Sequence, residues 1–387
     1  MSSLTASEPF HVRDHIPMPR DDAPLHGSAT REDRYPIHVT SSVAETAERL
    51  TGLIAGRRIG MVTDSVVEAL YAPELLRHLR DVADEVLVYA IPDGEASKSL
   101  DRAVELWHWL ADGPLARRDV LITFGGGVIN DLGGWVASGY MRGLPYVNLP
   151  TTLLAQVDGA LGGKVAVNHA VAKNLLGAFY QPAAVVANVS FLATLERRHL
   201  AAGLAECIKK AVIASPDYWS YIHRSADAVL DRDAEALTRL VRGAAAIKTA
   251  LIAQDPYEHD LRRPLNFGHT IGHPLETVSG YAPLLHGEAV AFGMVVESRI
   301  ACARGLMPPG LLEHLAGLLR RCGLPTTAAE LPAGVSADAV LGAMEKVRLI
   351  RDGSLRYVLP VALGVTVIAE DVTDREVRQA LAECGMT

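Results

Sequence analysis

Short apolar runs alternate with helix-type patterns between residues 36 and 191. The runs predict strands at residues 58–63, 85–91, 120–124, 146–149 and 184–189. Apolar residues at helical spacing lie between these runs, for example in residues 65–80 and 100–111. Because strands and helices alternate, we expect an α/β domain with a parallel sheet covered by helices on both faces.

The pattern becomes almost wholly helical after about residue 192. Apolar residues recur every three or four positions through residues 205–213 and 234–252. The apolar run 289–303 carries Glu297 and Arg299, so it predicts a buried core helix. Two late strands are predicted at residues 355–359 and 365–368, after a turn at Asp352 and Gly353. Residues 192–387 are therefore expected to form a second, α-helical domain.

The first 35 residues lack periodicity and predict a flexible tail. The formal net charge of −8 argues against a surface that coats nucleic acid. Four cysteines without a Cys-x-x-Cys motif suggest free thiols in a reducing cytosol. We see no secretory signal pattern and no apolar run of about 18 residues, so a cytoplasmic protein without a membrane partner is expected.

A candidate metal site lies in the second domain. His269 and His273 are four residues apart and share one face of a predicted helix, and His286 follows in a His-Gly-Glu segment. Upstream, Glu206 and Lys209 are three apart. Two histidines and a carboxylate are a usual ligand set for a catalytic divalent metal. A lone histidine is more often structural, and the two histidines of the first pair need not both be ligands.

A candidate dinucleotide site lies in the first domain. The predicted strand 120–124 runs into Gly125, Gly126 and Gly127, whose backbone N–H groups could face a phosphate at a helix N-terminus. A glycine triplet alone is equally consistent with a tight turn. The dinucleotide reading gains support from polar residues that follow neighbouring strands, namely Glu95, Lys98, Thr151 and Thr152.

A third polar group combines Asp158, Lys164, Lys173 and Asn174 among glycines. Two lysines and an amide suit a phosphate and hydroxyl groups, although a solvated loop with incidental lysines is the alternative. Lys248 lies on a mostly apolar predicted helix, where a cation is either functional or extends to the surface.

Several segments of the chain resemble the dehydroquinate synthase family, within the wider group of sugar phosphate cyclases. They are residues 125–131 (GGGVIND), 140–143 (YMRG), 150–158 (PTTLLAQVD), 162–164 (GGK), 177–182 (GAFYQP), 203–209 (GLAECIK), 265–273 (LNFGHTIGH) and 286–290 (HGEAV). The resemblance covers roughly residues 40–370 in one register. It implies an N-terminal NAD-binding α/β domain over residues 36–191 and a helical metal- and substrate-binding domain over residues 192–387.

The resemblance also implies roles for individual residues. The metal, zinc or cobalt, would be bound by Glu206, His269 and His286. NAD would be bound by Asp64, Glu95, Lys98, Gly126, Gly127, Val128, Asp131, Thr151, Thr152, Lys173, Phe191, Thr194 and Leu195. Catalytic roles would fall to Asp158, Lys209, Glu258 and His273, and substrate binding to Lys164, Asn174, Lys248, Arg262 and Asn266. Arg142 would reach the phosphate site of a partner subunit, which implies a homodimer.

The implied activity is that of a carbon–oxygen lyase that closes a seven-carbon sugar phosphate into a carbocycle with loss of phosphate. Residues 347–349 (VRL) replace a usual Asp-Lys-Lys, and His199 replaces a usual Glu, which favours a valiolone-type enzyme. Asn266 and His273 instead keep the dehydroquinate synthase state. We expect sedoheptulose 7-phosphate to be converted to a 2-epi-valiolone-type cyclitol in antibiotic biosynthesis. A 3-dehydroquinate or aminodehydroquinate synthase is the alternative, and a metal-dependent polyol dehydrogenase is a remote one.

Overall fold

The computed structural model describes residues 33–113, 115–169, 173–257, 263–280, 283–350 and 354–387, without the side chains of residues 349 and 350. Tyr35–Thr387 forms one compact unit. Most of the predicted tail and the predicted turn at Asp352 and Gly353 lie outside the described residues. The domain border near residue 191 stays a prediction.

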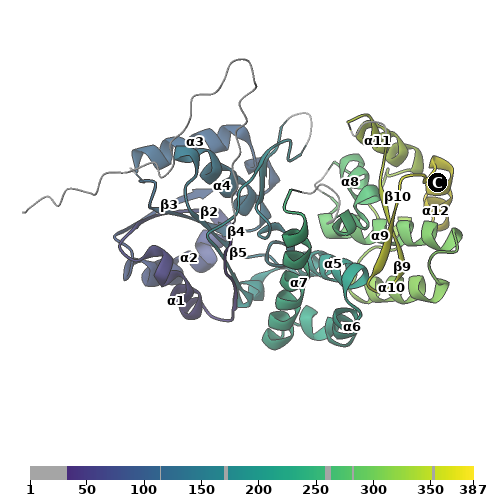
Figure 1. Ribbon diagram of the computed structural model, residues 1–387, viewed down its shortest axis with the longest axis horizontal. Coiled ribbons are helices and arrows are strands. Elements are labelled where there is room, and N and C mark those ends of the chain that lie inside the picture. Colours follow the sequence, from purple (N-terminus) through teal and green to yellow (C-terminus); the bar gives the residue numbers. More distant parts are fainter. Residues whose placement is uncertain (1–32, 114, 170–172, 258–262, 281–282, 351–353) are drawn as a thin grey trace, which may run out of the picture. The chain divides into compact units, whose positions relative to one another are not determined.

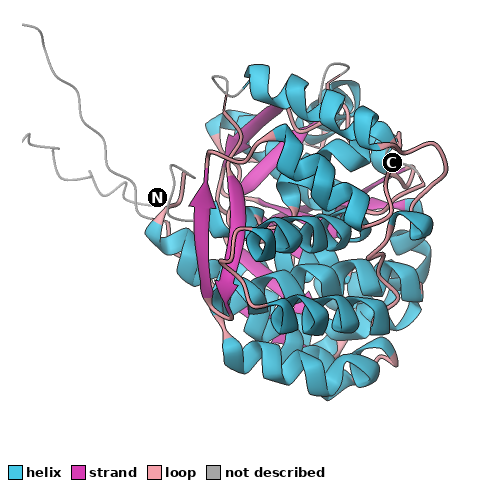
Figure 2. Ribbon diagram, turned by 90° about the vertical axis from the view of Figure 1, so that its right-hand side faces the viewer, coloured by secondary structure: helices cyan, strands magenta, loops and turns pink. Residues whose placement is uncertain are grey.

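A six-stranded parallel sheet, in the order β1-β8-β5-β4-β2-β3, organises the first half of this unit (Figures 1 and 2). Its strands are β1 (Ile37–Thr40), β2 (Arg58–Asp64), β3 (Glu85–Ile91), β4 (Val120–Gly125), β5 (Tyr146–Pro150) and β8 (Ala184–Asn188). The predicted strands are confirmed, and β1 is an addition. Four residues are too few to establish a period, and β1 is defined instead by its pairing with β8.

Helices cover both faces of the sheet, as the alternating pattern predicted. They are α1 (Val43–Ile54), α2 (Ser65–Arg80), α3 (Leu100–Asp112) and α4 (Gly127–Gly139). Successive strand residues point to opposite faces. Met61 of β2 accordingly packs in a core cluster with residues of α1 and α2, whereas the next residue, Val62, packs with residues of α3 and α4.

Two short strands outside this sheet, β6 (Lys164–Val167) and β7 (Leu176–Phe179), form an antiparallel pair. They were not predicted, because each is only four residues long and Leu176 and Ala178 of β7 are only half-buried. Lys164, the first residue of β6, and Asn174, which precedes β7, line the same cavity as other residues of the pair.

Helices build the second half of the unit, as predicted. They are α5 (Arg197–Ala214), α6 (Pro216–Leu230), α7 (Ala234–Gln254), α8 (His269–Val278), α9 (His286–Ala303), α10 (Pro309–Arg321), α11 (Ala337–Ile350) and α12 (Asp374–Glu383). The late strand pair is confirmed as β9 (Tyr357–Ala362) and β10 (Val365–Ala369), which are antiparallel. Helix α9 is the buried core helix that the sequence predicted. Within the described residues, no helix combines the length and the apolar character needed to cross a membrane.

Candidate active site

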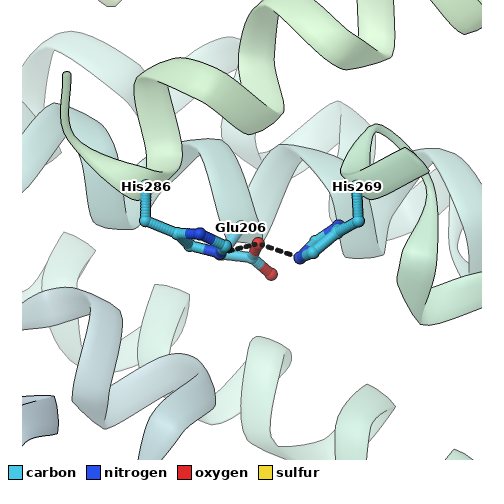
Figure 3. Close-up of side chains that lie close together, drawn as sticks. All are labelled: Glu206, His269 and His286. Carbon is cyan, nitrogen blue, oxygen red and sulfur yellow. Dashed lines mark ion pairs between the residues drawn. The ribbon is translucent and has the colours of Figure 1, made fainter. Parts of the chain in front are cut away.

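Three potential metal ligands converge from three helices (Figure 3). Glu206 lies in the middle of α5, and His269 and His286 are the first residues of α8 and α9. The Nε2 atoms of His269 and His286 lie 3.5 and 3.6 Å from Oε1 of Glu206. That oxygen is buried and has no hydrogen-bond partner among the described residues. A buried carboxylate oxygen that faces two imidazole nitrogens is suited to a divalent cation.

Glycines bring these helices into close contact. A side chain at Gly287 of α9 would overlap the Ala202 carbonyl group of α5. A side chain at Gly293 of α9 would overlap the carbonyl oxygen of Gly268, which precedes α8. Gly268 itself has φ of 80°, in the left-handed region that glycine favours. The three ligand-bearing segments therefore touch through backbone atoms.

Two buried lysines bind the other oxygen of Glu206. The Nζ atoms of Lys209 and Lys210 lie 2.5 and 3.3 Å from Oε2. Burial lowers the pKa of Lys209. Burial also opposes the charge of Lys210, but the carboxylates of Asp158 and Glu206 outweigh it and raise the pKa of this lysine. Oε2 of Glu206 is thus occupied by ammonium groups, and Oε1 is left for a cation.

Asp158 joins this charge cluster from a π-helical turn, Ala155–Gly159, that follows β5. Its Oδ1 accepts a hydrogen bond from Lys210 at 2.6 Å, and its Oδ2 lies 3.0 Å from Nζ of Lys248 on α7. Burial opposes ionisation of Asp158, but the two lysines hold its pKa well below the usual range. Burial lowers the pKa of Lys248 to about 8, although Asp158 acts in the opposite direction.

The imidazole of His286 lies between two carboxylates. Its Nδ1 is 3.1 Å from Oε2 of Glu276 on α8, on the side of the ring opposite Glu206. Burial lowers the pKa of His286, but Glu206 and Glu276 outweigh it and raise this pKa to about 10. A cation bound at Nε2 would take the place of a proton there, because a histidine ligand must be deprotonated.

The predicted NAD-binding residues follow the carboxyl ends of the parallel strands. Asp64 is the last residue of β2, Glu95 and Lys98 come after β3, and Gly126, Gly127 and Val128 come after β4. Thr151 and Thr152 follow β5, and the turn Val189–Thr194 with Leu195 follows β8. Strands β3 and β4 lie on opposite sides of β2, so the order in which strands are added to the sheet reverses at β2. Open α/β sheets bind ligands at such a switch point, outside the carboxyl ends of the strands.

Lys98 links this region to the segment between β6 and β7. Its Nζ lies 2.5 Å from Oδ2 of Asp131 on α4 and 2.5 Å from Oδ1 of Asn174. Glu95 accepts a hydrogen bond from Asn168 at 2.7 Å and lies 3.8 Å from Nζ of Lys173. Residues predicted for NAD and for substrate thus share one hydrogen-bonded network.

A cavity of about 490 Å³ is lined by residues from both candidate sites, among them Asp131 of the predicted NAD set and His269 of the predicted metal ligands. The predicted residues that line it are Asp131, Asp158, Lys164, Asn174, Lys209, Lys248, Asn266, His269 and His273. Residues predicted to bind NAD, the substrate and the metal therefore face one space. Five lysine or histidine side chains beside two carboxylates give it a surface suited to an anionic, hydroxyl-rich molecule.

Some predicted residues lie elsewhere. Arg142 is exposed and is not among the described residues that line the cavity. The Phe191 ring packs in the core against Tyr71 and Phe124, so only its backbone could meet a cofactor. Glu258 and Arg262 lie outside the described residues. Arg348 pairs with Glu345 and Asp374 and does not supply the positive charge that a lysine near residue 349 would give.

Two residues of the site were not predicted. Lys210 adjoins the predicted Lys209, and its spacing of four from Glu206 on an apolar helix was the available signal. Glu276 follows His273 by three residues, but no sequence spacing links it to His286, which lies beyond the loop between α8 and α9.

Comparisons with known proteins agree along nearly the whole chain. The models for the 3-dehydroquinate synthase N-terminal and C-terminal regions match residues 88–202 and 203–347. A 2-epi-valiolone synthase from Actinosynnema mirum is 53% identical over 372 residues, covering 96% of this chain and 97% of that protein. A 3-dehydroquinate synthase from Desulforamulus reducens is 40% identical over 350 residues, covering 90% of this chain and 97% of that protein.

One solved structure is similar in both sequence and fold. It is the 2-epi-5-epi-valiolone synthase of Streptomyces hygroscopicus with NAD+ and Zn2+ bound, at 30% identity and a TM-score of 0.86. The match covers 93% of this chain and 99% of that one. The resemblance seen in the sequence motifs is confirmed. The chain belongs to the dehydroquinate synthase family of sugar phosphate cyclases.

Proposed function

We propose that the protein converts sedoheptulose 7-phosphate to a 2-epi-valiolone-type cyclitol, acting as a carbon–oxygen lyase that releases inorganic phosphate. The observation that carries the proposal is the cavity whose wall combines His269 of the Glu–His–His cluster and Asp131 of α4 with the side chains predicted to bind the substrate. The 53% identity with a 2-epi-valiolone synthase favours this product over dehydroquinate. An antibiotic pathway and a cytoplasmic location stay predictions.

The residues present fit both a divalent metal and NAD. Glu206, His269 and His286 would bind zinc or cobalt, because Oε1 of Glu206, which has no hydrogen-bond partner among the described residues, faces both Nε2 atoms. Gly126 and Gly127 leave backbone N–H groups bare at the start of α4, where a pyrophosphate would lie. When bound, the metal supplies Lewis acidity at a substrate oxygen, and NAD supplies a reversible hydride acceptor.

The protein's own groups would bind the sugar phosphate and move its protons. Lys164, Lys248 and Asn266 would hold the phosphate and hydroxyl groups on the cavity wall. Lys209, whose pKa burial lowers, is suited to exchange a proton with a substrate hydroxyl. Asp158 stays ionised between Lys210 and Lys248, so it would accept hydrogen bonds from hydroxyl groups without taking up a proton.

The ion pairs of Arg348 support a substrate with one anionic end. With Arg348 bound to Glu345 and Asp374, the cavity lacks a cation from the end of α11 among the described residues. A heptulosonate phosphate carries a carboxylate as well as the phosphate. Each missing charge-assisted hydrogen bond costs about 1.5–3 kcal/mol. Sedoheptulose 7-phosphate has no carboxylate, so its binding depends less on a complete set of cations in the cavity.

The test offers each sugar phosphate separately to the metal-loaded enzyme with NAD. We expect phosphate release from sedoheptulose 7-phosphate, a carbocyclic product by mass and proton NMR spectra, and no net change in nicotinamide absorbance. Dehydroquinate from the heptulosonate phosphate, with sedoheptulose 7-phosphate inert, would instead identify a dehydroquinate synthase. Steady accumulation of NADH would identify a polyol dehydrogenase.

A second prediction places His273 on the substrate side of the metal. Its ring lies 5.0 Å from that of His269, one helical turn away, and it lines the cavity. His273→Ala should therefore keep its metal and lose about 10²–10⁴-fold in kcat, the usual contribution of a proton-transfer group. Metal content and kcat are measured on the same sample, with His269→Ala as the variant that loses metal. Parallel loss of metal and activity in His273→Ala would make His273 a ligand.

Arg142 is proposed to act on the phosphate site of a partner subunit. It is exposed at a turn where φ is 64°, outside the cavity of its own chain. The proposed role requires a homodimer, which light scattering in solution tests directly. A fully active monomer would rule out this role.

A further inference from the structure

The two candidate histidine ligands are oriented in the same way by different groups. Nδ1 of His269 lies 3.1 Å from the carbonyl oxygen of Phe267, and Nδ1 of His286 lies 3.1 Å from Oε2 of Glu276. In both cases Nε2 faces Oε1 of Glu206. A carbonyl oxygen only accepts hydrogen bonds, so Nδ1 of His269 carries the proton and its Nε2 presents a lone pair.

We propose that Glu276 is the positioning residue of His286: it accepts the Nδ1–H hydrogen bond and thereby holds Nε2 toward the metal site. Glu276 is only 8% exposed, and it reaches His286 from the neighbouring helix. Metal-binding histidines usually donate their second ring N–H to a carboxylate or carbonyl, which fixes the tautomer and the ring orientation. His269 has a backbone partner for this purpose, whereas His286 depends on one side chain.

A competing arrangement uses the same atoms differently. Ligand atoms of His273, Glu276 and His286 also lie within 4.8 Å of one another, so Glu276 could itself bind a cation. That arrangement would make Nδ1 of His286 a ligand and would exclude its hydrogen bond to Glu276. The two arrangements differ in the number of metal ions per chain and in the effect of an amide at residue 276.

The inference rests on the proposed metal site but not on the identity of the substrate, so it is tested by metal binding alone. The dissociation constant of Co2+ is measured by competition with a chelator for the wild type, Glu276→Gln and Glu276→Ala. The visible spectrum of the bound Co2+ reports the ligand geometry. Glu313→Gln, on an exposed face of α10, is the matched control.

We expect one Co2+ per wild-type chain and a dissociation constant that rises about 10–100-fold in Glu276→Ala. The dissociation constant of Glu276→Gln should lie between those of the wild type and Glu276→Ala, because the amide oxygen can still accept a hydrogen bond from Nδ1. The Co2+ spectrum should shift most in Glu276→Ala. The far-UV circular dichroism of both variants should match that of the wild type.

Wild-type affinity and an unchanged spectrum in Glu276→Ala would overturn the proposal. The proposal would also be overturned if the wild type bound two Co2+ per chain and Glu276→Ala bound one, since Glu276 would then be a ligand. Failure of the wild type to bind Co2+ would overturn the metal site itself. If these binding results hold and the cyclase assay fails, the proposed substrate is contradicted and the role of Glu276 is not.

Discussion

His286→Ala is expected to leave a folded protein without bound metal and without measurable turnover. The substitution removes one of three potential ligands and leaves Oε1 of Glu206 facing a single imidazole. A catalytic metal stabilises developing charge by several kcal/mol, and roughly 4 kcal/mol corresponds to about a thousandfold in rate. Metal content, circular dichroism and phosphate release from sedoheptulose 7-phosphate are measured on one preparation.

An exposed histidine provides the control for this experiment. His314 lies on α10, and His314→Ala should behave as the wild type in all three measurements. A full metal complement together with normal turnover in His286→Ala would contradict the assignment of the metal ligands.

Lys210→Met should have the second large effect, this time on stability as well as on rate. The ammonium of Lys210 is fully buried and pairs with both Asp158 and Glu206. Removing one partner of a buried ion pair costs about 3–5 kcal/mol, because the remaining charges are left without compensation. We expect a clearly lower unfolding temperature and weakened substrate binding, since Asp158 loses one of the two cations that hold it.

Lys346→Met tests whether the loss of any lysine would lower the unfolding temperature. Lys346 is exposed on α11, so its substitution should change the unfolding temperature little. Unfolding of Lys210→Met at the wild-type temperature would mean that Asp158 and Glu206 are stabilised without Lys210.

The repeating features of the fold were predictable because they follow from local pattern. Strands such as β4 and β5 are buried on both faces, so they read as continuous apolar runs in the sequence. The β6–β7 pair escaped prediction, because strands of four residues, one of them without a buried residue, leave almost no local pattern.

The same distinction applies to the site. Glu206, His269 and His286 stand in recognisable motifs, and the structure brings them together. The pairing of Glu276 with His286 depends on how α8 packs against α9. The ion pair of Arg348 with Asp374 likewise depends on how α11 packs against α12. Neither contact can be inferred from spacing along the chain.

The glycine contacts between α5, α8 and α9 separate the geometry of the metal site from the chemistry of the cavity. Where Gly287 meets Ala202 and Gly293 meets Gly268, the distance between the helices is set by backbone atoms. Substitutions of cavity-lining side chains such as Lys164, Asn174 and Asn266 are therefore expected to leave the ligands in place. Such a scaffold lets a lineage change the sugar it accepts by altering the cavity wall alone, while the metal-binding centre is inherited intact.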